Sequence, residues 1–247
     1  MMRNIKIIIE YDGKNFAGWQ NQPGKVSVQG EIERALHEVT DEEINVMASG
    51  RTDAGVHALG QVANFHTNTN IEIHKIPYAI NSKLPKSIRV TSAEEVEERF
   101  HARYNCKGKT YRYIINNHEF PSALNRFREF HIAQELNVEE MKKALQFFEG
   151  THDFKGFKSS GGSEKKTTVR TLTKCELKEE NKIITVELSG DGFLYNMVRI
   201  IVGTIVDVGL GKIKADDIPD IIASCDRTKA GKTLPPHGLY LVQVNYL

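Results

Sequence analysis

The sequence has few cysteines, and none is placed for a disulfide framework or a metal site. Cys106, Cys175 and Cys225 are the three cysteines among 247 residues, and no two of them form a CxxC pair. A sparse, odd count of this kind is typical of proteins from a reducing compartment. We therefore expect neither disulfide bonds nor a zinc cluster.

Long apolar runs are absent as well. The opening residues, "MMRNIKIIIEYDG", contain an apolar run that is too short for a signal peptide and lack a small-residue cleavage site. No stretch approaches the roughly 18 apolar residues that a membrane span requires. These absences predict a cytoplasmic protein that is not inserted in a membrane.

Signatures of common cofactor and nucleophile sites are also missing. Gly-Lys-Thr occurs at 108–110 and 231–233, but Arg103 and Asp226 stand where a phosphate-binding loop needs its first glycine. The nine histidines show neither HExxH spacing nor a zinc-ligand pairing with cysteine, and no Ser or Cys lies in a nucleophile elbow. The sequence therefore gives no sign of a metal, a nucleotide or an organic cofactor.

The net charge is small, but it is unevenly distributed. The whole chain carries +1, whereas residues 99–174 hold 15 Lys and Arg against 8 Asp and Glu, a net +7 that leaves −6 for the remainder. Chance clustering of solvated side chains explains this as well as a surface that faces a polyanion does. Charge alone leaves both interpretations open.

Two segments of similar pattern follow one another along the chain. Residues 4–13 predict a strand, 27–40 a helix, and 43–49 and 60–67 two further strands. The order repeats with a strand at 109–117, a helix at 137–150 and strands at 171–178 and 182–190. We expect an α/β (α+β) fold of two ferredoxin-like halves, 1–104 and 105–247, fused through a continuous, largely antiparallel sheet with the active-site cleft at the seam.

The remaining elements belong to the second half. Residues 195–209 predict an almost wholly apolar, buried helix, 215–225 a short amphipathic helix and 238–247 a final strand. Between helix and strand lies "DFKGFKSSGGSEKKTTVR", a Gly- and Ser-rich loop with five Lys and Arg. This basic loop is either an ordinary solvated connection or an arm over nucleic acid.

The stretch "ASGRTDAGVHALGQVANFHT" is the most unusual in the chain, because it holds Arg51 and Asp53 in a glycine-bracketed turn. Asp53 could form the turn through its own backbone, could pair structurally with an arginine, or could be a catalytic carboxylate kept ionised by a nearby guanidinium. The residues alone leave all three roles open.

Together with other blocks, this stretch closely resembles the tRNA pseudouridine synthase A family. The further blocks, in the family's order, are "YDGKNFAGWQNQ", "RFHARYNCKGKTYRYII", "GDGFLYNMVRIIVGTIVDVG" and "PPHGLYLVQVNY". They extend from about Tyr11 to Tyr246, nearly the whole chain. The resemblance implies isomerisation of uridine to pseudouridine in the anticodon stem-loop of tRNA, at the family's positions 38, 39 and 40.

The resemblance also implies a role for particular residues. Asp53 matches the catalytic aspartate, Tyr111 the tyrosine that stacks under the uracil, and Arg199 the arginine that pairs with the aspartate. Arg51 matches an arginine that holds the RNA backbone or replaces the flipped base. Leu239 falls where the family has an apolar pocket residue, although ordinary strand core explains it equally well.

Contacts with the rest of the tRNA are expected from basic residues. These are His101, Arg103, Lys158, Lys165 and Lys166. The family acts as a homodimer and uses neither a metal nor any other cofactor, which the resemblance implies here too. Whether the aspartate attacks C1′ or C6, or acts as a base, stays open.

Two other classes of protein remain as alternatives. A non-catalytic RNA-binding module could keep the fold and lose the chemistry. A carboxylate-dependent hydrolase of nucleosides or sugars would need a second acid near Asp53, and no motif supplies one.

Overall fold

The computed structural model describes residues 2–161 and 167–246, and the chain divides into two compact units. Unit 1 comprises Met1–Lys107 with Tyr240–Leu247, and unit 2 comprises Gly108–Leu239. The last strand therefore packs with the N-terminal unit. The sequence predicts two halves, 1–104 and 105–247, and places that strand in the second half. The assignment of functional residues to these two halves stays a prediction.

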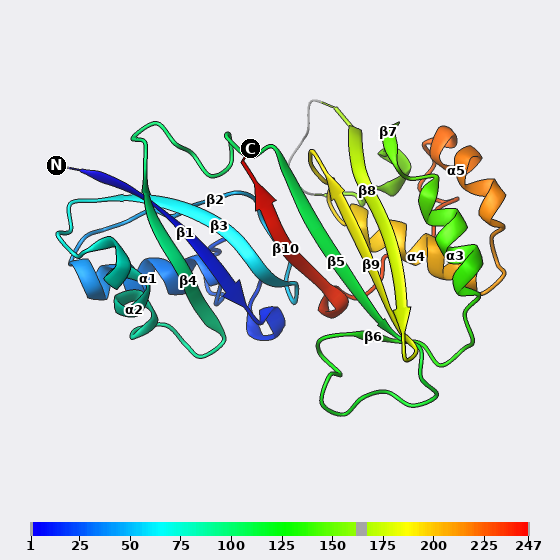
Figure 1. Cartoon of the computed structure of the whole chain (residues 1–247), viewed down its shortest axis with the longest axis horizontal. Coiled ribbons are helices and arrows are strands. Elements are labelled where there is room, and N and C mark those ends of the chain that lie inside the picture. Colours follow the sequence, from blue (N-terminus) through cyan, green and yellow to red (C-terminus); the bar gives the residue numbers. More distant parts are fainter. Residues whose placement is uncertain (1, 162–166, 247) are drawn as a thin grey trace. The chain divides into compact units, whose positions relative to one another are not determined.

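Unit 1 holds the strands β1 (Arg3–Tyr11), β2 (Met47–Ala48), β3 (His57–Thr67) and β4 (Ile88–Val96), with the helices α1 (Val28–Thr40) and α2 (Ile76–Asn81) (Figure 1). It also holds β10 (Leu239–Asn245) except for its first residue, Leu239, which belongs to unit 2. β1 lies between β4 and β3 and is antiparallel to both. β2 pairs antiparallel with β3, and β10 runs parallel to β3. The chain order β1-α1-β2-β3-α2-β4 with these pairings is the ferredoxin-like arrangement.

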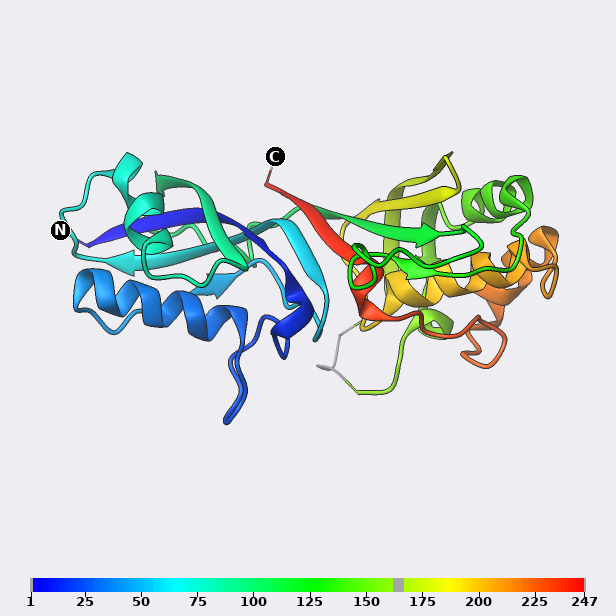
Figure 2. The same cartoon turned by 90° about the horizontal axis from the view of Figure 1, so that it is seen from below.

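Alternating side chains bury one face of this sheet. Ile5, Ile7 and Ile9 of β1 are fully buried, as expected when every second residue of a strand points to the same face. α1 covers this apolar surface along one side of the sheet (Figure 2). Ser27 caps the start of α1 because its side chain accepts a hydrogen bond from the backbone N–H of Gly30 at 3.1 Å.

Unit 2 holds the strands β5 (Gly108–Asn116), β6 (Phe130–His131), β7 (Gly150–Asp153), β8 (Val169–Glu180) and β9 (Ile183–Gly190), with the helices α3 (Val138–Gln146), α4 (Met197–Gly209) and α5 (Ile218–Ser224). The strand order β5-β9-β8-β7 is antiparallel throughout, and β6 pairs parallel with β5. The α/β class and the largely antiparallel pairing expected from the sequence are confirmed in each unit.

α4 is the central helix of unit 2 and passes behind the strands in Figure 1. Its residues are nearly all buried, as the apolar sequence predicts. The segment that precedes β10 crosses it closely, because a Cβ at Gly203 would lie 1.9 Å from the carbonyl oxygen of Lys232. The second Gly-Lys-Thr sequence thus belongs to a packing contact, in which Gly231 N–H donates to Thr204 Oγ1 at 2.9 Å.

One expected strand is much shorter than predicted. Residues 43–49 suggested a strand, but the structure has only Met47–Ala48. The backbone N–H of Val46 donates to the side chain of Glu33 at 3.1 Å and so does not take part in a strand ladder.

No helix among the described residues is long and apolar enough to cross a membrane.

Candidate active site

Asp53 lies in the connection between β2 and β3, in the turn that precedes β3. The connection starts at Ser49, whose N–H donates to the carbonyl of Val62 at 2.8 Å, and ends in a turn in which Val56 N–H donates to Asp53 O at 3.1 Å. Gly55 within this turn has φ +79°, a conformation that glycine adopts without strain. Asp53 is half-buried, in a turn that the following strand anchors.

The residue before Asp53 is fixed from the N-terminal block. The hydroxyl of Tyr11 and Oγ1 of Thr52 are 2.7 Å apart in a buried hydrogen bond, and Trp19 N–H donates to Thr52 O at 3.0 Å. Burial raises the pKa of Tyr11 well above its ordinary value, so its hydroxyl stays neutral at physiological pH. The side chain and the backbone carbonyl of Thr52 are therefore both hydrogen-bonded, which restricts the movement of the adjoining Asp53.

Two glycines let the N-terminal block approach this connection closely. Gly18 has φ +99°, and a Cβ there would lie 2.6 Å from Thr52 O. A Cβ at Gly13 would lie 2.0 Å from Val56 O. The backbone of "YDGKNFAGWQ" thus packs directly against that of "GRTDAG" and the residue after it. This packing is a physical reason for both blocks to occur in one chain.

Arg51 is exposed and aimed by a chain of side-chain amides. Its Nε donates to Oε1 of Gln20 at 3.0 Å, and Nε2 of Gln20 donates to Oε1 of Gln29 on α1 at 2.9 Å. Through Gln29 and Gln20, α1 therefore orients the guanidinium of Arg51, two residues from Asp53 in the sequence. A guanidinium offers a planar fork of N–H donors, which matches the geometry of phosphate groups.

Tyr111 is a half-buried residue of β5 in unit 2, opposite Leu188 of β9. Its ring meets the ring of Phe193 edge to face, with centroids 5.0 Å apart and an interplanar angle of 79°. Such pairs favour one ring orientation. Phe193 therefore holds Tyr111 in place from the loop that follows β9.

Arg199 lies in the first turn of α4 and is held at two nitrogens. Nε donates to Leu234 O at 2.6 Å, and an amino nitrogen donates to Oδ1 of Asn196 at 2.7 Å. Asn196 has φ +62° and donates in turn to Oγ of Ser159 at 3.0 Å. This chain of contacts links the guanidinium to the segment that carries Lys158.

The charge of Arg199 also acts on the neighbouring strand. Burial raises the pKa of the Tyr113 hydroxyl strongly, and the positive charge of Arg199 offsets part of that rise. The Tyr113 hydroxyl donates a hydrogen bond to Pro235 O at 2.8 Å. The contacts of Arg199 thus include the Leu234 carbonyl and the Asn196 amide, and its charge reaches the neutral Tyr113 phenol.

The other residues singled out from the sequence are divided between the units. Leu239, at the start of β10, is buried, which suits either strand core or a pocket wall. His101 is half-buried and Arg103 exposed in unit 1, and Lys158 is half-buried in unit 2. Lys165 and Lys166 lie outside the described residues. Arg51 and Asp53 share one connection of unit 1, whereas Tyr111 and Arg199 belong to unit 2.

Several supporting residues escaped the sequence reasoning. Gln20 orients Arg51, Tyr11 fixes Thr52, Phe193 packs on Tyr111 and Asn196 holds Arg199. All four lie inside the blocks on which the resemblance rests, and that position was the available signal. Among the described residues, no group of three or more His, Cys, Asp or Glu is arranged to hold a metal ion.

Comparison with known proteins identifies the class to which this fold and these residues belong. A family model described as "tRNA pseudouridine synthase" matches residues 7–105 and 144–247, so the chain belongs to that family of isomerases.

Individual relatives agree over their full length. A protein of Acetivibrio thermocellus is 55% identical over 245 residues, covering 99% of this chain and 100% of its own, and is named tRNA pseudouridine synthase A. Proteins of a Thermoanaerobacter species and of Caldicellulosiruptor saccharolyticus are each 53% identical, with the same coverage and the same name.

Proposed function

We propose that this enzyme isomerises uridine to pseudouridine in the anticodon stem-loop of tRNA, at positions 38, 39 and 40, with Asp53 as the catalytic carboxylate. One observation carries the proposal more than any other. Asp53 sits directly after a residue that is bonded through both its backbone and its side chain, in a connection that tolerates no Cβ at Gly18. Catalysis by a carboxylate benefits from this degree of positioning.

The reaction defines what the site must do. The N1–C1′ bond of uridine breaks, the uracil turns, a C5–C1′ bond forms, C5 loses a proton and N1 gains one. The change is redox-neutral, so the bonds balance without an electron donor. An ionised carboxylate can attack C1′ or C6, or remove a proton as a base, and each route needs the carboxylate aimed at the sugar–base junction.

Tyr111 and Arg199 take the roles that the resemblance implies. Stacking on an aromatic ring contributes roughly 1–3 kcal/mol per base, comparable with the few kcal/mol that extruding a base costs. Tyr111, held by Phe193, would offset much of that cost. Arg199 carries a permanent charge that favours an ionised carboxylate beside it. Leu239 is assigned as an apolar residue of the substrate pocket.

Binding of the remaining tRNA is assigned to exposed cations. Arg51 contacts the backbone or takes the place of the flipped base, and His101, Arg103 and Lys158 contact phosphates, as do Lys165 and Lys166. The excess of positive charge over residues 99–174 favours this assignment. A homodimer in the cytoplasm that needs no cofactor is part of the same proposal.

Pseudouridine mapping tests the proposal. Unmodified tRNA is incubated with the enzyme, and pseudouridines are located by carbodiimide treatment and primer extension, with free uridine assayed in parallel. We expect modification confined to the 3′ side of the anticodon stem-loop and no reaction of free uridine. Turnover of free uridine would favour a nucleoside hydrolase, and tRNA binding without any modification would favour a binding module.

A further inference from the structure

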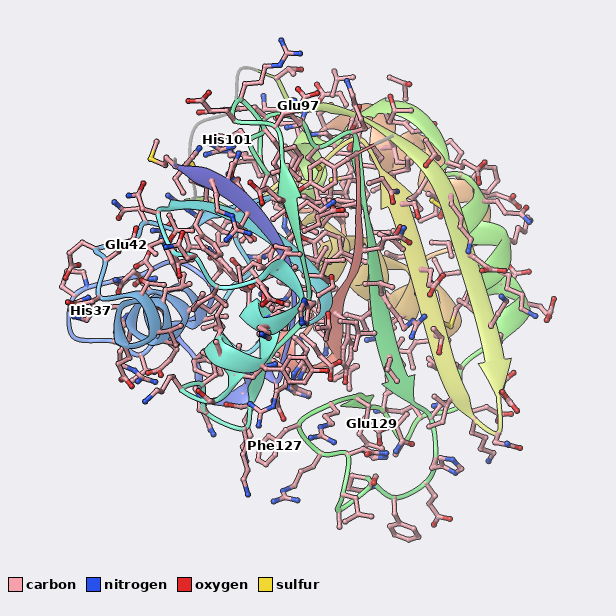
Figure 3. All side chains as sticks on the ribbon, turned by 60° about the vertical axis from the view of Figure 1, so that its left-hand side comes forward. His37, Glu42, Glu97, His101, Phe127 and Glu129 are labelled. Atoms are coloured by element: carbon pink, nitrogen blue, oxygen red, sulfur yellow. The ribbon has the colours of Figure 1, made fainter. Side chains whose placement is uncertain are left out.

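The segment that follows β4 in unit 1 presents a large aromatic side chain to solvent. Tyr104 is 78% exposed, in a run that contains the cations Arg99, Arg103 and Lys107 and, between residues 99 and 107, no acidic residue. Figure 3 shows the labelled Glu97 and His101 in this segment. Glu97 accepts from Nε of Arg99 at 3.1 Å, which leaves Arg103 and Lys107 as the cations beside Tyr104 in sequence.

The inner side of the segment is fixed by a buried pair of asparagines. Nδ2 of Asn4 donates to the carbonyls of Glu97 at 3.0 Å and Phe100 at 2.9 Å, and Oδ1 of Asn4 accepts from Nδ2 of Asn64 at 2.8 Å. Oδ1 of Asn64 accepts from Ala102 N–H at 2.8 Å. Asn4 is 3% exposed and Asn64 is fully buried. Buried amides are costly unless satisfied, so these bonds specify one path for the backbone.

The outer side is fixed by its own side chains. His101 N–H donates to Oδ1 of Asn105 at 2.8 Å, and Nδ1 of His101 accepts from Arg103 N–H at 3.1 Å. The His101 ring lies against the Tyr104 ring, with centroids 4.2 Å apart and planes inclined by 40°. Tyr104 is therefore backed by a ring whose orientation the backbone sets.

These contacts make an ordered aromatic surface rather than a mobile side chain. The Tyr104 ring contacts the His101 ring in a tilted arrangement, while most of the side chain stays in water. Proteins that bind unpaired nucleic acid use such rings as stacking platforms and place cations beside them for the backbone. The cations beside this ring favour an anionic partner.

We propose that Tyr104, backed by His101, is a stacking platform for an unpaired nucleobase of the RNA substrate, with Arg103 contacting the adjoining phosphate. The inference rests on the proposed RNA substrate and adds a base-binding residue to those assigned to the chemistry. Tyr104 would strengthen substrate binding and leave the chemical step unchanged.

A matched pair of tyrosines in unit 1 provides the test. Tyr78 on α2 is also 78% exposed, so Tyr78→Ala controls for the loss of an exposed phenol. We expect Tyr104→Ala to weaken the Kd for unmodified tRNA about 5- to 150-fold, the range that loss of one base stack gives. The KM should rise in parallel while kcat stays within about twofold, and Tyr104→Phe and Tyr78→Ala should bind like wild type.

Crosslinking supplies a readout that is independent of turnover. Irradiation of 4-thiouridine-containing tRNA bound to the wild-type protein should label the peptide that spans residues 99–107, and Tyr104→Ala should lose the label. Equal Kd values for Tyr104→Ala and Tyr78→Ala, or equal losses in Tyr104→Phe and Tyr104→Ala, would overturn the stacking platform. A fall in kcat alone would also overturn it.

Failure of the proposed function gives a different result. A wild-type protein that binds tRNA and crosslinks through Tyr104 but forms no pseudouridine would refute the isomerase proposal and keep the platform. A wild-type protein that does not bind tRNA would refute both.

Discussion

The hydroxyl of Tyr11 on β1 lies 2.7 Å from Oγ1 of Thr52, the residue directly before Asp53. Both side chains are buried. The bond thus joins the first strand of the chain to the connection that carries the candidate carboxylate. Positioning of Asp53 depends in this way on a residue that never needs to touch the substrate.

Tyr11→Phe should therefore affect stability and activity together. The change leaves the Thr52 hydroxyl without its buried partner, which costs about 1–2 kcal/mol. We expect urea unfolding to show that loss and kcat to fall, with the KM for tRNA little changed. Tyr78→Phe, at an exposed position, should leave both measurements at wild-type values. An unaltered kcat in a measurably destabilised Tyr11→Phe protein would remove Tyr11 from a positioning role.

Alkaline pH should weaken the fold. Burial raises the pKa of Tyr11, Tyr113 and Tyr246 above the ordinary value of 10.0. Above pH 10 the unfolded chain releases these protons while the folded chain keeps them. The stabilisation is therefore complete below pH 10 and is lost as pH rises beyond it. Thermal melts from pH 8 to 11 should show Tm falling above pH 10, and Tyr11→Phe should reduce the slope. A Tm that does not change across this range would contradict the raised pKa of these tyrosines in the folded chain.

Gly18→Ala tests the close approach beneath the catalytic connection. Gly18 has φ +99°, and its new methyl group would lie 2.6 Å from Thr52 O, so the backbone must shift. Displacement of catalytic groups by about 1 Å can lower rates by roughly 100-fold. We therefore expect kcat to fall about 10- to 100-fold. Gly24→Ala is the control, because Gly24 also has positive φ, +71°, but a Cβ there meets nothing within 4 Å. Equal effects of the two changes would mean that backbone strain, not the contact with Thr52, is responsible.

Arg199→Lys tests whether the guanidinium geometry matters. Lysine keeps the charge but cannot donate both to Leu234 O and to Asn196 Oδ1 in the arrangement seen for arginine. We expect kcat to fall on the order of 10- to 100-fold. Arg112→Lys in the same unit, where the partner is the partly exposed Glu187 at 2.7 Å, should change kcat by less than about twofold. A Lys variant at residue 199 with wild-type kcat would show that charge alone suffices there.

The long, periodic elements could be predicted from the sequence, whereas short edge elements could not. α1 and α4 carry clear apolar patterns, and both helices are present. β4 was missed because only its first residues, Ile88 and Val90, are buried and the remainder is polar, as suits a strand at the edge of the unit 1 sheet. α2 contains Pro77 and has six residues, too few to show a helical period.

The site shows a similar division. Arg51 and Asp53 stand out because glycines bracket them in an unusual turn. Gln20 and Asn196 do not stand out. The role of Gln20 comes from its contact with Arg51, far along the chain, and Asn196 adopts a left-handed backbone conformation that the sequence pattern does not reveal. Gln20 is 31 residues from Arg51, and no spacing rule connects them. The distribution of roles between the two units stays a prediction from the resemblance.

Tritium release is the most direct test of whether Asp53 is the carboxylate of a uridine isomerisation. C5 must lose its hydrogen when it becomes the glycosidic carbon, so tRNA labelled with tritium at uridine C5 releases label with each turnover. Wild type and Asp53→Asn are compared, because the amide keeps the size of the side chain and removes its charge. We expect release by wild type and background release by Asp53→Asn, with similar tRNA binding by both. Release by Asp53→Asn within about tenfold of wild type would contradict this role of Asp53.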